Sequence, residues 1–113
     1  MEIKTFSEYQ SEAIKTAKQF EEKNMALAYS VLGITGETGE VSEIIKKHIR
    51  GDGELDILKL KKEIGDVIWY IARLCDALEI TMEECAQINI LKLRKRHGET
   101  FTGHGNRETP ETE

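Results

Sequence analysis

Two short stretches of this 113-residue sequence place acidic side chains three positions apart. Glu37 and Glu40 form one pair, with Glu43 continuing the row, and Glu63 and Asp66 form the other. Residues three apart share one face of a helix, so each pair presents its carboxylates together. Such a pair can bind a hard cation; taken alone, it is more often an ordinary solvated acidic face.

The position of Glu37 favours a cation-binding site over a solvated acidic face. At about 100° per residue, Glu37 falls inside the arc formed by Ile34, Val41 and Ile44, where a packing surface is expected. A carboxylate bordering such a surface is unusual.

Glycines accompany both pairs. Gly33, Gly36 and Gly39 lie in the first stretch and Gly65 in the second, although each interior glycine costs a helix about 1 kcal/mol relative to alanine. We expect these glycines to let two helix backbones approach closely, bringing four carboxylates around a cation that offsets their repulsion. The alternative is that Gly36 and Gly39 break the first helix.

The candidate ligands narrow the choice of metal. All are carboxylate oxygens, and no histidine follows any of them by three residues, unlike the pattern of di-iron bundles. Mg²⁺ fits best, with Mn²⁺ as a possible substitute. Because Mg²⁺ is typically held by a few carboxylates together with substrate phosphates, the site predicts a phosphate-bearing ligand.

A downstream segment offers groups that could bind those phosphates. Asn89, Lys92 and Arg96 share one helix face with the apolar residues Met82 and Leu93. Lysine and arginine facing inward could grip phosphate oxygens. The alternative is that both cations point outward and complement the helix dipole.

Tyr70 falls on the same side of its helix as Glu63 and Asp66. Its ring could stack on a nucleobase or belong to the core, and the sequence favours neither; for the adjacent Trp69 the core is favoured.

Apolar periodicity predicts four helices, over about 6–23, 26–50, 56–79 and 81–98, with capping boxes at Thr5–Glu8 and Thr81–Glu84. One proline and 6% aromatic residues also favour an all-α, four-helix bundle-like domain over residues 1–100. Residues 101–113 are expected to form a flexible polar tail. Cys75 and Cys85, ten residues apart, resemble small buried hydrophobes rather than a disulfide or zinc site.

Composition excludes several classes of protein. A net charge of −5 argues against stable, sequence-independent nucleic-acid binding. The sequence contains no apolar run long enough for a membrane span and no signal-peptide core, so we expect a cytoplasmic protein. A core this small that also hosts a charged pocket favours a homodimer or homotetramer.

The motifs together resemble the MazG-like family of all-α nucleoside triphosphate pyrophosphohydrolases over about residues 5–100. The matching segments are Gly36-Glu37-Thr38-Gly39-Glu40, Glu63-Ile64-Gly65-Asp66, and Asn89 to Lys92 continuing through Arg96. Gly36 replaces the leading glutamate of the family's doubled pair, a variant similar to that of small single-domain and phage-type members.

The resemblance implies Mg²⁺-dependent cleavage of a nucleoside triphosphate between its α and β phosphates, giving a monophosphate and pyrophosphate, usually for nucleotide-pool house-cleaning. Glu37, Glu40, Glu63 and Asp66 would hold Mg²⁺. Within the Glu37–Glu40 pair, a carboxylate not fully committed to the metal would orient or deprotonate the attacking water, with Glu37 the first candidate. The phosphate- and nucleotide-binding residues would be Asn89, Lys92, Arg96 and Tyr70.

Two rivals to this function remain open. One is a non-enzymatic helical module that acts through self-association or partner binding. The other is a metal-dependent hydrolase with a different cut, releasing orthophosphate or acting on nucleoside diphosphates.

Overall fold

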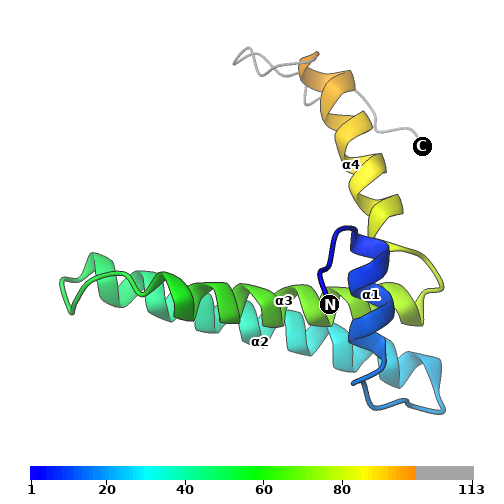
Figure 1. Ribbon diagram of the computed structural model, residues 1–113, viewed down its shortest axis with the longest axis horizontal. Helices are drawn as coiled ribbons and strands as arrows, with labels where there is room; N and C mark the ends of the chain where they lie inside the picture. Colours follow the sequence, from blue (N-terminus) through cyan, green and yellow to red (C-terminus); the bar gives the residue numbers. More distant parts are fainter. Residues whose placement is uncertain (99–113) are drawn as a thin grey trace.

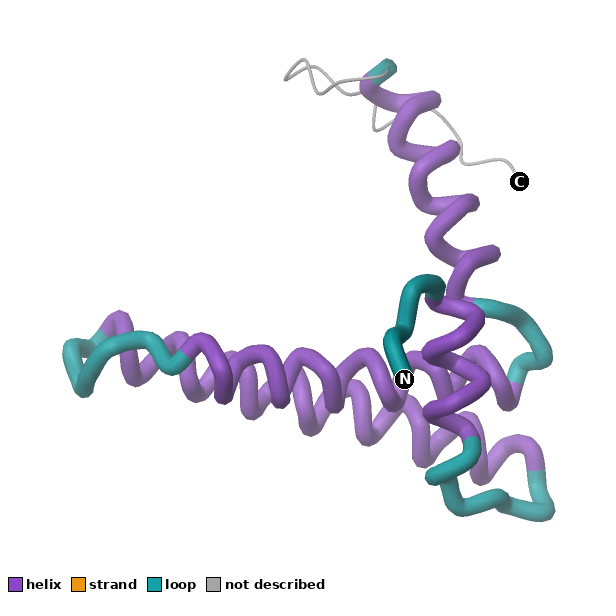
Figure 2. Tube along the Cα trace, viewed as in Figure 1, coloured by secondary structure: helices purple, strands orange, loops and turns teal. Residues whose placement is uncertain are grey.

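The computed structural model describes residues 1–98, and all of their regular structure is helical (Figures 1 and 2). The expected all-α class is therefore confirmed. The expected tail, 101–113, lies outside the described residues. The four helices are α1 (Phe6–Ile14), α2 (Lys23–Ile49), α3 (Ile57–Ala77) and α4 (Met82–His97).

The first helix is shorter than expected. Of the capping box predicted at Thr5–Glu8, one bond is present: the Thr5 side chain accepts from the backbone N–H of Glu8. The helix begins at Phe6 as predicted, but it ends at Ile14 rather than near residue 23. The backbone N–H and hydroxyl of Thr16 both donate to the carbonyl of Ala13, which closes the helix. The following loop then packs its own side chains against α3, so the apolar spacing that suggested a longer helix reflects tertiary contacts.

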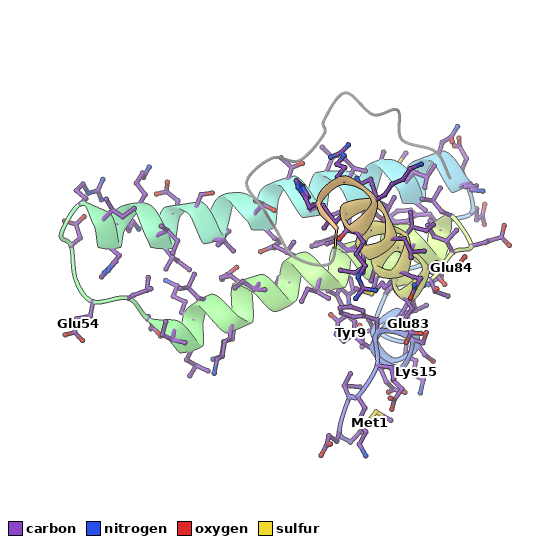
Figure 3. All side chains as sticks on the ribbon, turned by 90° about the horizontal axis from the view of Figure 1, so that it is seen from above. Met1, Tyr9, Lys15, Glu54, Glu83 and Glu84 are labelled. Carbon is purple, nitrogen blue, oxygen red and sulfur yellow. The ribbon has the colours of Figure 1, made fainter. Side chains whose placement is uncertain are left out.

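The α2 and α3 helices form a long antiparallel hairpin (Figure 1). α2 runs without interruption through its three glycines, so the alternative of a break at Gly36 and Gly39 is wrong. In the turn, Gly51 and Gly53 adopt φ of 94° and 137°, which L side chains rarely tolerate. Figure 3 shows Glu54, in this turn, at the end of the hairpin remote from α1.

The other two helices gather at the opposite end of the hairpin. α1 packs on α3, and α4 leaves this junction at a steep angle to the hairpin (Figure 1). Gln10 joins the parts: its Oε1 accepts from the N–H of Met82 at 2.8 Å, and its Nε2 donates to the carbonyl of Ile80 at 3.0 Å. The expected capping box of Thr81 and Glu84 opens α4 with both reciprocal bonds.

The core is small and lies at this junction. Ala13, Ala72, Cys75 and Met82 form its buried centre, with partly buried residues such as Trp69 around them. Among residues 1–98, only contacts between α2 and α3 hold the part of the hairpin beyond α1. The acidic residues lie on the α2–α3 hairpin, with Asp66 near Tyr9 of α1.

Candidate metal centre

Three of the four predicted carboxylates meet across the α2–α3 seam. Glu37 of α2 and Glu63 and Asp66 of α3 each offer an oxygen atom, and these atoms lie within 4.8 Å of one another. Glu37 and Glu63 are half-buried, whereas Asp66 is exposed, so the cluster opens to solvent on one side. Glu63 and Asp66 lie together because they are three residues apart on one helix. Glu37, 26 residues before Glu63 in the sequence, joins them because α2 packs against α3.

The electrostatics of the cluster favour a bound cation. Partial burial, a side-chain hydrogen bond with Glu63 and the nearby charge of Asp66 all raise the pKa of Glu37 above 4.5. Three carboxylates at this separation repel one another unless a proton or a cation lies between them. A hard divalent cation such as Mg²⁺ or Mn²⁺ suits an all-oxygen ligand set of this kind.

Glu40 is placed differently from its three companions. It is exposed and outside the group that meets within 4.8 Å, although its charge still contributes to the raised pKa of Glu37. The next acid in the row, Glu43, pairs with Lys46 at 2.6 Å, and this hydrogen bond lowers the pKa of Glu43. The surroundings of the acidic residues therefore differ along α2: Glu37 lies in the cluster, whereas Glu43 lies in a surface ion pair.

Tyr70 lies beside the cluster, in the seam between the helices. Partial burial is the main cause of its raised pKa, followed by a hydrogen bond to Tyr29, and the charge of Glu37 adds to both. The ring meets Trp69 edge-on at 5.0 Å between centroids. Tyr70 is thus a packing residue that also neighbours the carboxylates, and its contact with a nucleobase stays a prediction.

The glycines correct one expectation. A Cβ atom added to Gly33 would overlap the Tyr70 ring, so close approach does require glycine there. Within the described residues, a Cβ at Gly36, Gly39 or Gly65 would meet nothing within 4 Å. The expected close approach beside both acidic pairs is therefore wrong at these three positions in the single chain.

The predicted phosphate-binding residues do not join the cluster within one chain. Asn89, Lys92 and Arg96 follow one another along α4, which contacts α1 and α3 but not α2 in the described structure. α4 projects away from the hairpin on which the carboxylates lie (Figure 1). Asn89 is exposed, and Lys92 and Arg96 are half-buried.

One residue beside the cluster, Tyr9 of α1, was not predicted from the sequence. The charge of Asp66 adds to burial in raising the pKa of Tyr9, which places this α1 residue near the cluster. Tyr9 also lines an apolar cavity of about 520 Å³ with Ile3, Phe6, Gly65 and Ile68. Apolar periodicity predicts a helix over about 6–23 and, with it, a packing role for Phe6 and Tyr9, but nothing in the sequence indicates that these residues lie beside Gly65.

The second cysteine also differs from expectation. Cys75 is buried, as predicted, but Cys85 is exposed. Both thiols are free. Burial and the neighbouring Cys85 raise the pKa of Cys75 to about 11.

Comparisons with known proteins identify the family of this chain. The model of the MazG nucleotide pyrophosphohydrolase domain matches residues 27–101. The Gene 37 protein of Mycobacterium phage L5 is 36% identical over 74 residues, covering 62% of this chain and 65% of the phage protein. The match thus spans less than two thirds of that relative.

No solved structure gave a significant match. Among residues 1–98, no helix combines the length and apolar character that a membrane span requires. The family match covers both acidic pairs and the α4 segment, and on this basis the chain belongs to the MazG nucleotide pyrophosphohydrolase domain family.

Proposed function

We propose that this protein is an Mg²⁺-dependent nucleoside triphosphate pyrophosphohydrolase that cleaves between the α and β phosphates. Family membership supports nucleotide pyrophosphohydrolase activity in general. The observation that carries the finer proposal is the convergence of Glu37, Glu63 and Asp66 within 4.8 Å. This donor set suits a hard divalent cation and, with it, a polyphosphate substrate.

In this proposal the carboxylates hold Mg²⁺, with Mn²⁺ as a substitute, and Glu40 joins them from the next turn of α2. The bound cation would supply positive charge that offsets the triphosphate and favours deprotonation of the attacking water. Oxygen from this water bonds to the α phosphorus, and the bond from that phosphorus to the α–β bridging oxygen breaks. The products are a nucleoside monophosphate and pyrophosphate.

Glu37 is our candidate for the group that accepts the water's proton, with Glu40 as the alternative. A carboxylate whose pKa lies above its ordinary value is a better base near neutral pH than an unperturbed one. Glu37 is also a member of the cluster, which opens to solvent on one side, where water has access.

Asn89, Lys92 and Arg96 are proposed to bind the phosphates, and Tyr70 to contact the nucleoside. Because α4 does not meet α2 within one chain, this role requires another copy or a movement of α4 to bring the cations to the cluster. We therefore propose a homodimer or homotetramer as the active form. We further propose that the enzyme acts in the cytoplasm, where it removes unwanted nucleotides from the nucleotide pool.

Phosphorus NMR tests the proposal directly. Full-length protein with millimolar Mg²⁺ and a mixture of common and damaged nucleoside triphosphates should release pyrophosphate and monophosphates, and EDTA should stop the reaction. Glu63→Gln should abolish turnover, whereas Glu43→Gln, whose parent carboxylate lies in a surface ion pair, should retain it. Orthophosphate release would favour a different cut. The absence of any reaction with Mg²⁺ or Mn²⁺ would favour a non-enzymatic module.

A further inference from the structure

The two cysteines of this chain lie on either side of the turn that joins α3 to α4. Cys75 belongs to the last turn of α3, and Cys85 lies four residues after the N-cap of α4. Cys75 is 4% exposed, whereas Cys85 is exposed. Neither thiol belongs to the proposed metal site, so their placement calls for a separate explanation.

The turn after α3 brings Ile80 onto Cys75. The backbone N–H of Ile80 donates to the carbonyl of Cys75 at 3.0 Å, and the N–H of Glu79 donates to the carbonyl of residue 76 at 3.1 Å. Glu79 has a φ of 59°, so the helix ends in a Schellman motif. This motif commonly includes a side-chain contact between the positions that Cys75 and Ile80 occupy, and Ile80 packs against the buried cluster that contains Cys75.

The start of α4 turns Cys85 toward the same place. Thr81 is the N-cap, so Ile80 and Cys85 occupy the two positions that pack together in a hydrophobic staple. Met82 lies three residues before Cys85, on the same side of α4, and belongs to the buried cluster with Cys75. The end of one helix and the beginning of the next therefore direct both cysteines toward Ile80.

The two thiols meet at this point. A side-chain hydrogen bond joins Cys75 and Cys85. Burial is the main cause of the raised pKa of Cys75, about 11, and the neighbouring Cys85 adds to it. Thiols in contact across a turn are placed to form a disulfide when an oxidant is present.

We propose that Cys75 and Cys85 form a reversible disulfide within one chain when a peroxide is present, and that this bond ties the start of α4 to the end of α3. An exposed thiol beside a second, resolving thiol is the usual arrangement of a redox-sensing pair. In reducing compartments such bonds are transient rather than structural. The proposal does not depend on the proposed enzymatic function.

The reaction has two steps. The thiolate of Cys85, the exposed residue, attacks one oxygen of the peroxide, the O–O bond breaks, and the departing oxygen leaves as water after taking up protons. Cys85 is then a sulfenic acid. The sulfur of Cys75 attacks the sulfur of Cys85, the S–O bond breaks, and the hydroxyl leaves with the proton of Cys75 as a second water. The two thiols lose two electrons in total, and the peroxide gains them.

The bond would act on the helix that carries the proposed phosphate-binding residues. Asn89 lies one turn beyond Cys85 on α4. A covalent link at Cys85 restricts movement of this helix relative to α3. Amide hydrogen exchange in the first turns of α4 should therefore be slower in the oxidised protein than in the reduced protein.

Oxidation of the full-length, reduced protein with hydrogen peroxide tests the proposal. Free thiols, counted in denaturant, should fall from two per chain to none, and dithiothreitol should restore both. The protein should still run at 12.9 kDa on a non-reducing gel. Cleavage at the glutamates between the cysteines should leave two peptides joined until reduction, with a mass about 2 Da below that of the two thiol peptides together. A disulfide-linked dimer would overturn the proposal, and so would sulfinic acid at Cys85 beside an unchanged Cys75.

Single-cysteine variants provide matched controls. Cys75→Ser removes the resolving thiol, so peroxide should leave a sulfenic acid at Cys85 that dimedone traps, whereas wild type should give little trapping. Cys85→Ser should leave the buried Cys75 unmodified under the same conditions. Equal dimedone trapping in wild type and Cys75→Ser would show that Cys75 does not resolve the sulfenic acid.

A measurement on the wild type alone guards against variants that fail to fold. In glutathione redox buffers, the equilibrium constant for disulfide formation should be about tenfold or more higher in the folded protein than in urea, because the fold holds the two sulfur atoms together. Equal constants, or a lower constant in the folded protein, would show that the fold does not position Cys75 and Cys85 for this bond.

Discussion

The ring of Tyr70 in α3 occupies the space that a side chain at position 33 of α2 would need. This overlap lies one turn from Glu37, and any side chain at position 33 would have to displace the Tyr70 ring. Gly36 and Gly39, the other glycines of α2, have no such neighbour in the described part of the chain, so they serve as controls for Gly33.

Gly33→Ala should lower the free energy of unfolding by about 1–3 kcal/mol, because the added methyl must displace the Tyr70 ring. Gly36→Ala and Gly39→Ala should each raise it by about 0.5–1 kcal/mol, since alanine is the better helix former and its Cβ meets nothing within 4 Å. Urea denaturation of the three variants measures both effects. Equal changes in all three would show that Tyr70 yields without cost.

Metal binding should stabilise the protein through the carboxylate cluster. A cation that binds only the folded state at ten times its Kd adds about 1.4 kcal/mol, which corresponds to a rise in Tm of several degrees. Glu63→Gln or Asp66→Asn should remove most of this Mg²⁺ response, while leaving the metal-free protein as stable as wild type or more so, because repulsion is relieved.

Glu43→Gln is the control for this experiment, because Glu43 is paired with Lys46 outside the cluster. Its Mg²⁺ response should equal that of wild type. Thermal melts with and without millimolar Mg²⁺ measure this response in each variant. The same melts of Glu40→Gln measure how much Glu40, on the adjacent turn of α2, contributes to Mg²⁺ binding. An undiminished response in both cluster variants would remove the metal from the α2–α3 seam.

The pH dependence of stability should report on Glu37. Its pKa is raised above 4.5 in the folded chain, so the folded protein holds this proton more tightly than the unfolded chain does. Metal-free protein should therefore lose stability as pH rises from about 4.5 through the raised pKa, with the full penalty present above it. Chemical denaturation across this range should show a shallower loss for Glu37→Gln; identical slopes would refute the assignment.

The two thiols should react at very different rates. Cys75 is buried with a pKa of about 11, so almost none of it is thiolate at pH 8, whereas Cys85 is exposed. Iodoacetamide at pH 8 should modify one thiol per chain rapidly, and mass spectrometry should locate it at Cys85. Denaturant should release the second thiol. Rapid modification of both in the folded protein would contradict the burial of Cys75.

Local sequence determined much of this protein. The three-residue spacing of Glu63 and Asp66 places both carboxylates on one helix face, and the side chains of Thr5 and Thr81 cap α1 and α4 as predicted, because these relations extend over a single helical turn. The four helices follow from apolar periodicity for the same reason. The spacing of the acidic residues also supports the resemblance to the MazG-like family, and the match to the MazG domain model confirms that resemblance.

Only the tertiary structure decided which of these groups meet. Glu37 joins the α3 acids while Glu40 stays exposed, because antiparallel packing selects one narrow line of α2 to face the partner helix. The first helix ends at Ile14 because the loop after it is held by α3: the indole of Trp69 donates to the Thr16 hydroxyl at 3.1 Å, and Arg73 donates to the carbonyl of Lys18. In the described part of the chain, α4 joins the core through Met82 at its start and then projects away from the hairpin with its cations (Figure 1). These outcomes depend on contacts between residues far apart in the chain, and helical periodicity carries no information about such contacts.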